Sequence, residues 1–149
     1  MSIGLCMIVK NEQEVLARCL DSAKDVADEI VIVDTGSDDA TIDIAKKYTD
    51  KVYSYRWNFD FAAARNYAFS LSSADYILWL DADDVLLEKD CAALQALKKT
   101  MDGSVNAYFL RYNAAFDEDG NVTMYFFRER IVKRECGFAW QGLSLIHIS

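Results

Sequence analysis

The sequence predicts an α/β fold with a mainly parallel sheet, helices on both faces of that sheet, and an antiparallel hairpin near the C-terminus. Two observations support this prediction. Short apolar runs typical of strands alternate with helical patterns as far as Thr100. Beyond Thr100, two strand-like runs flank a turn, which is the pattern of a hairpin.

Four apolar runs are the predicted parallel strands. The first, Ile3–Val9, is apolar at nearly every position, which is typical of a strand covered on both faces. The others are residues 30–33, 51–55 and 76–80. Apolar residues at helical spacing predict helices over residues 14–24, 40–47, 59–71 and 86–100. Ser37 or Asp38 is expected to cap the second helix, and Asp60 the third.

The predicted hairpin joins residues 107–112 to residues 122–128. Between them, Asp119-Gly120-Asn121 supplies the residue types that tight turns favour. Residues 131–133 are expected to add a further short strand.

Composition limits the possible partners. The chain has 149 residues, a net charge of −8, one histidine and four scattered cysteines. The negative charge argues against nucleic acid, whose phosphates need a basic face. No apolar run reaches the ~20 residues of a membrane-spanning helix, and the N-terminus lacks the basic start of a signal peptide. The cysteines indicate reduced thiols, so we expect a cytoplasmic protein, free or peripheral at the inner face of the membrane.

The candidate site lies where the predicted strands end. In a parallel sheet, ligands bind at the carboxyl ends of the strands. Lys10-Asn11, Asp34 and Asp81-Ala82-Asp83 each follow a predicted strand, so the fold should bring them to one edge. Since the chain has one histidine, a metal site here needs oxygen ligands, which favours Mg²⁺, Mn²⁺ or Ca²⁺.

The carboxylates of Asp81 and Asp83 can hold a hard divalent cation together. One carboxylate would bind the ion directly and the other through water, and the ion would bridge the acidic edge to an anionic diphosphate. The alternative is that Asp83 and Asp84 only cap the helix that follows.

Other side chains suit the same ligand. The carboxylate of Asp34 can accept from ribose hydroxyls or from a base. Arg65 could reach a diphosphate as a fixed cation, or form a surface ion pair with Asp60. Aromatic residues near the third helix are expected in the core or in a staple at the helix start; these are Trp57, Phe59 and Phe61.

Four motifs together resemble the N-terminal half of a family 2 glycosyltransferase with the GT-A fold. They are "LCMIVKNE", "DEIVIVDTGSDDAT", "WNFDFAAARNYAF" and "YILWLDADDVL", and the resemblance covers residues 3 to 142. It is strongest to the bacterial branch of lipopolysaccharide-core-type and peptide S-glycosylating transferases. The resemblance implies inverting transfer of a sugar from a nucleotide-activated donor, with UDP as the expected nucleotide. The acceptor would be a glycan, a lipid-linked glycan or a peptide.

The resemblance also implies roles for individual residues. The base and ribose site would be lined by Val9, Lys10 and Asn11, with Asp34 on the uridine. The rest of the nucleotide sugar would contact Asp60, Arg65, Asp81 and Ala82. Asp83, together with Asp81, would ligate Mn²⁺ or Mg²⁺.

The acceptor side of this site is not identified in the sequence. The branch places a His-Glu pair after a Trp/Tyr-x-Gly stretch, and Trp140-Gln141-Gly142 matches that stretch. Leu143 and its neighbours stand where the pair is expected, and His147 has no Glu after it, so the catalytic base is unknown. We expect residues 1–142 to form a donor-binding domain truncated at its C-terminus, and residues 143–149 to be a foreign or frame-shifted tail.

Two alternatives stay open. The chain could be a nucleotide-sugar-binding module without activity. It could also be a phosphotransferase of the haloacid dehalogenase type, whose nucleophile would be Asp81 in "LDADDV".

Overall fold

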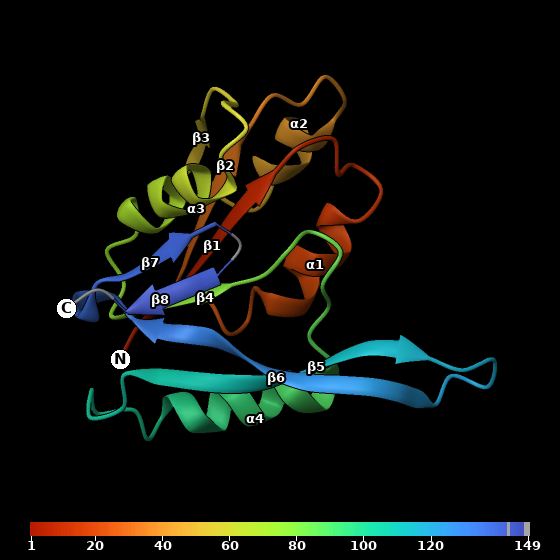
Figure 1. The fold of residues 1–149 in the computed structure, drawn as a ribbon, viewed down its shortest axis with the longest axis vertical. Helices are drawn as coiled ribbons and strands as arrows, with labels where there is room; N and C mark the ends of the chain where they lie inside the picture. Colours follow the sequence, from red (N-terminus) through yellow and green to blue (C-terminus); the bar gives the residue numbers. More distant parts are fainter. Residues whose placement is uncertain (143, 148–149) are drawn as a thin grey trace.

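The computed structural model describes residues 1–142 and 144–147 and confirms the predicted α/β fold (Figure 1). A six-stranded sheet has the order β3-β2-β1-β4-β6-β5, and a second sheet pairs β7 with β8. Strands β1 to β4 are parallel, β6 is antiparallel to β4, and β5 is antiparallel to β6. The strands are β1 (Ile3–Val9), β2 (Glu29–Asp34), β3 (Val52–Ser54), β4 (Tyr76–Trp79), β5 (Ala107–Phe116), β6 (Val122–Lys133), β7 (Phe138–Gln141) and β8 (Ser144–His147).

Two layers cover the faces of the large sheet. The helices are α1 (Leu16–Ala23), α2 (Thr41–Ala45), α3 (Phe61–Ser70) and α4 (Glu88–Lys98), with a 3₁₀ turn at Arg134–Cys136. Helices α1, α2 and α4 share one hydrophobic core with the sheet, whereas α3 and β7 share the other (Figure 1). Strand β1 serves both cores, because Leu5 and Met7 belong to the first and Cys6 to the second. This explains why its sequence is apolar at nearly every position.

The start of α2 differs from the prediction. Neither Ser37 nor Asp38 caps this helix, which follows Ala40 and has no side-chain cap at that residue. The amide of Thr41 donates instead to the carboxylate of Asp39, 2.9 Å away. By contrast, the predicted cap of α3 is confirmed, since the Asp60 carboxylate accepts from the amide of Ala63 at 3.1 Å.

Phe59 and Phe61 were expected in the core or in a staple at the helix start, and the core alternative is wrong. Phe59 is 89% exposed and Phe61 is 49% exposed. Both rings contact Trp57 edge to face, with centroids 6.2 and 4.8 Å apart. The backbone of Phe59 also has a positive φ of 62°, which is uncommon for a residue other than glycine. The three aromatic rings therefore border the start of α3 instead of entering the core.

The predicted hairpin is confirmed and is longer than expected. Residues 131–133 are the end of β6 and not a separate strand. The hairpin projects beyond the rest of the sheet (Figure 1). At its turn, the Asp117 carboxylate accepts from the amides of Asp119 and Asn121, and Gly120 takes a φ of 83°.

Strand β8 lies within the stretch predicted to be a tail. Residues 144–147 pair with β7, while residues 143, 148 and 149 lie outside the described part. All four cysteines are free, as expected of reduced thiols. Burial raises the pKa of the Cys6 and Cys19 thiols to about 12. Within the described residues, every helix is too short or too polar to cross a membrane.

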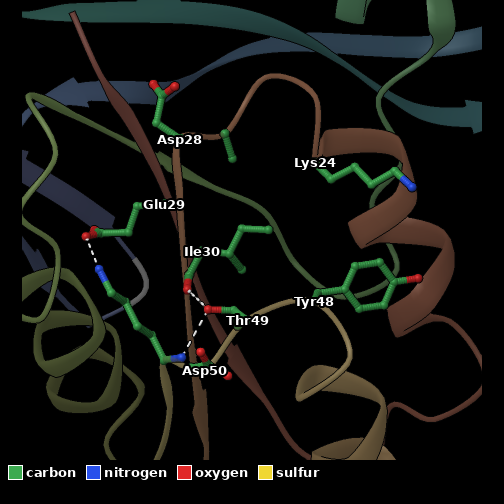
Figure 2. A pocket seen from close by; sticks show the side chains of 9 residues that line it. Lys24, Asp28, Glu29, Ile30, Tyr48, Thr49 and Asp50 are labelled. Carbon is green, nitrogen blue, oxygen red and sulfur yellow. Dashed lines mark hydrogen bonds and ion pairs between the residues drawn. The ribbon is translucent and has the colours of Figure 1, made fainter.

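A cluster of hydrogen bonds lies at the N-terminal end of β2, around Glu29. Figure 2 shows Glu29 beside a cavity of about 400 Å³, which Lys51 also lines. The Glu29 carboxylate accepts from Lys51 at 2.7 Å, from the Ser72 hydroxyl at 2.6 Å and from the Ser73 hydroxyl at 2.9 Å. Burial alone would raise the pKa of Glu29, but these hydrogen bonds outweigh it and lower the pKa from 4.5 to about 2.

This lowered pKa makes stability depend on pH. Because the folded pKa of Glu29 is below its unfolded value, its contribution is complete above about pH 4.5 and is lost as the pH falls toward 2. We expect Glu29→Gln to remove roughly 1–3 kcal/mol of the free energy of unfolding at pH 7 and to flatten its fall between pH 4.5 and 2. Urea titrations across this range measure both effects. Glu118→Gln, in the exposed hairpin turn, is the matched control, and equal pH profiles for parent and Glu29→Gln would contradict the assignment.

Candidate functional site

A cleft of about 490 Å³ opens at the carboxyl ends of β1 and β4, at the edge predicted from the sequence. Its lining residues are Ile8, Val9, Lys10, Glu12, Thr35, Trp57, Phe61, Arg65, Asp81, Ala82 and Asp83. Among the predicted site residues, Val9, Lys10, Arg65, Asp81, Ala82 and Asp83 line the cleft, and Asn11, Asp34 and Asp60 do not. The cavity in Figure 2 is a different one, because it lies where β2 begins.

Arg65 and Asp81 form an ion pair inside the cleft. Nη2 of Arg65 lies 2.8 Å from Oδ1 of Asp81. The Arg65 side chain is 17% exposed, and that of Asp81 is 46% exposed. The alternative prediction, in which Arg65 pairs with Asp60, is therefore wrong. Since only one oxygen of Asp81 contacts Arg65, the carboxylate also faces the open part of the cleft.

The guanidinium of Arg65 lies against two indole rings that are nearly perpendicular to each other, with centroids 4.8 Å apart. Its central carbon is 4.7 Å from the ring centroid of Trp140 and 5.4 Å from that of Trp79. Stacking on aromatic faces suits the planar guanidinium and stabilises its charge. Arg65 is thus a fixed cation, with one anionic partner in the cleft.

Asp84 has a different environment from Asp83. Its carboxylate accepts from Arg130 at 2.9 Å and from the backbone amide of Asp81 at 2.8 Å. This ion pair is buried, with the Arg130 side chain 5% exposed and that of Asp84 11% exposed. The alternative, in which Asp83 and Asp84 cap the following helix, is wrong, because α4 begins at Glu88 and Leu87 precedes it without a side-chain cap. Asp84 instead fixes the loop that presents Asp81 and Asp83 to the cleft.

Asn11 joins two loops beside the cleft, and Asp34 holds one of these loops in shape. The buried Asp34 carboxylate accepts from the amides of Gly36 and Ser37 and from the Ser37 hydroxyl. Asn11, at a φ of 52°, donates its amide to the Ser37 hydroxyl and accepts from the amide of Asp38. These contacts shape the loops that carry Lys10 and Thr35. The roles of Asn11 and Asp34 in binding a nucleotide stay predictions.

Glu12 adds a carboxylate that the sequence reasoning did not assign to the site. Burial raises the pKa of Glu12, and the nearby charges of Asp83, Asp81 and Asp39 raise it further. Its position directly after Lys10-Asn11 at the end of β1 was the available signal. The aromatic walls, Trp57 and Phe61, were also missed as lining residues. The cleft thus combines apolar walls, two cationic side chains and an acidic rim, which is formed by Glu12, Asp81 and Asp83.

The acidic rim fits a hard divalent cation that shares its ligands with a substrate. Among the described residues, no three His, Cys, Asp or Glu side chains cluster closely enough to hold an ion alone. Mg²⁺ and Mn²⁺ need few protein ligands, because water and phosphate oxygens complete their shell. Asp83 is exposed at the cleft and Asp81 is half-exposed, so both offer oxygens there.

Comparison with known proteins identifies the family. The sequence model of Glycosyl transferase family 2 matches residues 5–148. The chain belongs to glycosyl transferase family 2. This membership confirms the resemblance that the four sequence motifs predicted.

Relatives of this family 2 chain are longer proteins. A TPR repeat-containing protein of Synechococcus elongatus is 48% identical over 85 residues, which cover 57% of the chain and 21% of that protein. The SPbeta prophage-derived glycosyltransferase SunS of Bacillus subtilis is 31% identical over 98 residues, which cover 64% of the chain and 23% of SunS. The chain therefore matches less than a quarter of the length of either relative.

Solved structures with similar folds confirm the GT-A architecture. Residues 1–349 of S. aureus TarS superpose with a TM-score of 0.56 at 23% identity, over 67% of the chain and 33% of that structure. A second TarS structure gives a TM-score of 0.52 at 27% identity, over 62% of the chain and 19% of that structure.

The buried pair of Arg130 and Asp84 gives a test of how the site loop is held. Asp84→Asn leaves a buried guanidinium without its counter-charge, so we expect the free energy of unfolding to fall by about 3 kcal/mol. Asp83→Asn is the matched control, because Asp83 is exposed and a surface change of this kind stays within about 0.5 kcal/mol. Urea denaturation measures both variants. Equal stability of the two would show that Asp84 does not anchor the loop.

Proposed function

We propose that the chain forms, over residues 1–142, the donor-binding domain of a glycosyltransferase whose cleft takes a nucleotide-activated sugar. The observation that carries this proposal is the Arg65–Asp81 pair inside a cleft that Asp83 also lines. A metal-bound diphosphate needs cationic donors for its oxygens and oxygen ligands for its metal. Arg65 supplies the first, and the two exposed carboxylates supply the second.

The proposed nucleotide is UDP. In support, S. aureus TarS 1–349, with a TM-score of 0.50 at 24% identity, has been solved in complex with UDP. In this chain, Val9, Trp57 and Phe61 give apolar walls against which a base and ribose can pack. Asn11 and Asp34 enter the proposal as the residues that shape the two loops at that end of the cleft.

The proposed metal is Mn²⁺ or Mg²⁺, with Asp83 as its direct ligand. Asp81 would contribute the oxygen that does not contact Arg65, directly or through water. When bound, such an ion neutralises negative charge on the diphosphate as it leaves the sugar. Arg65 would donate to the same diphosphate, and because its side chain is already fixed, it can stabilise the leaving group without rearranging.

The proposed reaction is an inverting transfer to a glycan, lipid-linked glycan or peptide acceptor. The acceptor would attack the anomeric carbon from the side opposite the leaving UDP while a base takes its proton. Family 2 membership argues against the phosphotransferase alternative with Asp81 as nucleophile. Slow release of UDP from a UDP-sugar would separate an enzyme from a binding module without activity.

Calorimetric titration of the chain with UDP tests the donor site and its metal. We expect binding in the presence of Mn²⁺ and its loss on addition of a chelator, because the acidic rim repels a bare diphosphate. Asp83→Asn should weaken Mn²⁺-dependent binding about tenfold or more, since an amide is a poorer ligand for a hard ion than a carboxylate.

The matched control is Asp25→Asn, an exposed position outside the cleft with the same change of charge. It should bind UDP as the parent does. Equal affinity with and without chelator would contradict the metal assignment. No binding of UDP under either condition would contradict the donor site itself.

A further inference from the structure

The indole of Trp140 is the closer of the two rings that contact the Arg65 guanidinium. It comes from β7, which pairs with β8 and is not part of the six-stranded sheet. Trp140 is nevertheless 5% exposed. Its ring packs edge to face on Trp79, with centroids 4.8 Å apart, and on Phe69, at 6.2 Å. A residue of a separate small sheet thus completes the environment of a cation in the cleft.

Strand β7 is held against α3 beside Arg65 itself. The next residue of α3, Asn66, makes two hydrogen bonds with the backbone of Trp140. Its Nδ2 donates to the Trp140 carbonyl at 3.0 Å, and its Oδ1 accepts from the Trp140 amide at 2.6 Å. One turn of α3 therefore carries the Arg65 guanidinium and also fixes the strand that supplies the Trp140 ring. This fixes the position of the ring relative to the guanidinium.

The indole N–H of Trp140 adds an independent observation. Nε1 is buried and has no hydrogen-bond partner within the described residues. An unpartnered buried donor is unfavourable, so a phenylalanine would fill this place without that penalty. Tryptophan has the stronger attraction for a cation of the two. Its presence is thus better explained by the guanidinium 4.7 Å from its ring than by packing alone.

We propose that Trp140 is a positioning residue that holds the guanidinium of Arg65 in the cleft, oriented for the diphosphate. This inference rests on the proposed nucleotide function. An arginine side chain is long and flexible, and ordering it at the moment of binding weakens affinity. Trp140, together with the ring of Trp79 and the carboxylate of Asp81, orders it in advance. Affinity for the diphosphate therefore depends on the docking of β7.

Three variants test this inference by calorimetry with UDP and with uridine at one Mn²⁺ concentration. Trp140→Leu should weaken UDP binding about tenfold and leave uridine binding unchanged, because only UDP contacts Arg65. Trp140→Phe keeps a ring and should weaken UDP binding only about threefold. Phe69→Leu is the control, because Phe69 packs on Trp140 but is not one of the two rings against the Arg65 guanidinium. The Tm of this variant should fall, while the ratio of its UDP affinity to its uridine affinity should equal that of the parent chain. An equal loss of UDP and uridine, or the same ratio in Phe69→Leu as in Trp140→Leu, would overturn the inference.

A measurement without nucleotide separates this inference from the proposed function. The Arg65 Nε–H signal in an NMR spectrum of the free chain, assigned by its loss in Arg65→Lys, reports the ring currents of both indoles. We expect Trp140→Leu to move it toward the position of an exposed arginine and Phe69→Leu to leave it in place. An unmoved signal in Trp140→Leu would overturn the positioning role. A moved signal in a chain that does not bind UDP would support that role and contradict the nucleotide function.

Discussion

Three carboxylates, those of Asp81, Asp83 and Asp84, follow the buried strand β4. The way their charges are balanced determines the structure of the cleft at the end of this strand. Asp81 pairs with Arg65 and Asp84 pairs with Arg130, while Asp83 is exposed at the cleft. Both guanidiniums also stack on Trp79, which is 1% exposed on β4. The ring that ends the strand thus supports the two cations that neutralise the loop after it. These two ion pairs fix the positions of Asp81 and Asp84 and leave the carboxylate of Asp83 available for a ligand.

The amino ends and the carboxyl ends of the parallel strands differ in how fully their polar side chains are hydrogen-bonded. Where β2 begins, Glu29 is saturated by Lys51 and two serines, which stabilises the fold. At the carboxyl ends of the strands, Asp81 keeps one oxygen without a protein partner among the described residues, and the charges of Asp83 and Asp81 act on Glu12. Satisfied polar groups stabilise a fold, whereas partly satisfied ones cost stability and suit a ligand. The contrast supports the cleft, and not the cavity beside Glu29, as the site of binding.

The sequence predicted what depends on local pattern and failed where distant residues decide. Strand β1 was predicted to its ends because burial on both faces leaves a continuous apolar run, and parallel topology then fixed the edge that holds the site. Asp84 was misassigned because its partner is 46 residues away on β6. Trp140 was recognised only as part of the Trp140-Gln141-Gly142 motif, because no local sequence pattern indicates that it contacts Arg65. The core was one of two alternatives for Phe59 and Phe61 because aromatic residues are often buried, but both side chains are exposed at the start of α3.

A crystal structure of the chain grown with UDP and Mn²⁺, with the anomalous signal of manganese, tests the central claim most directly. The account predicts a manganese peak on the Asp83 carboxylate and the diphosphate of UDP between that ion and the Arg65 guanidinium, with Arg65 still in contact with the rings of Trp79 and Trp140. Manganese bound away from Asp83, or a diphosphate out of reach of Arg65, would contradict it.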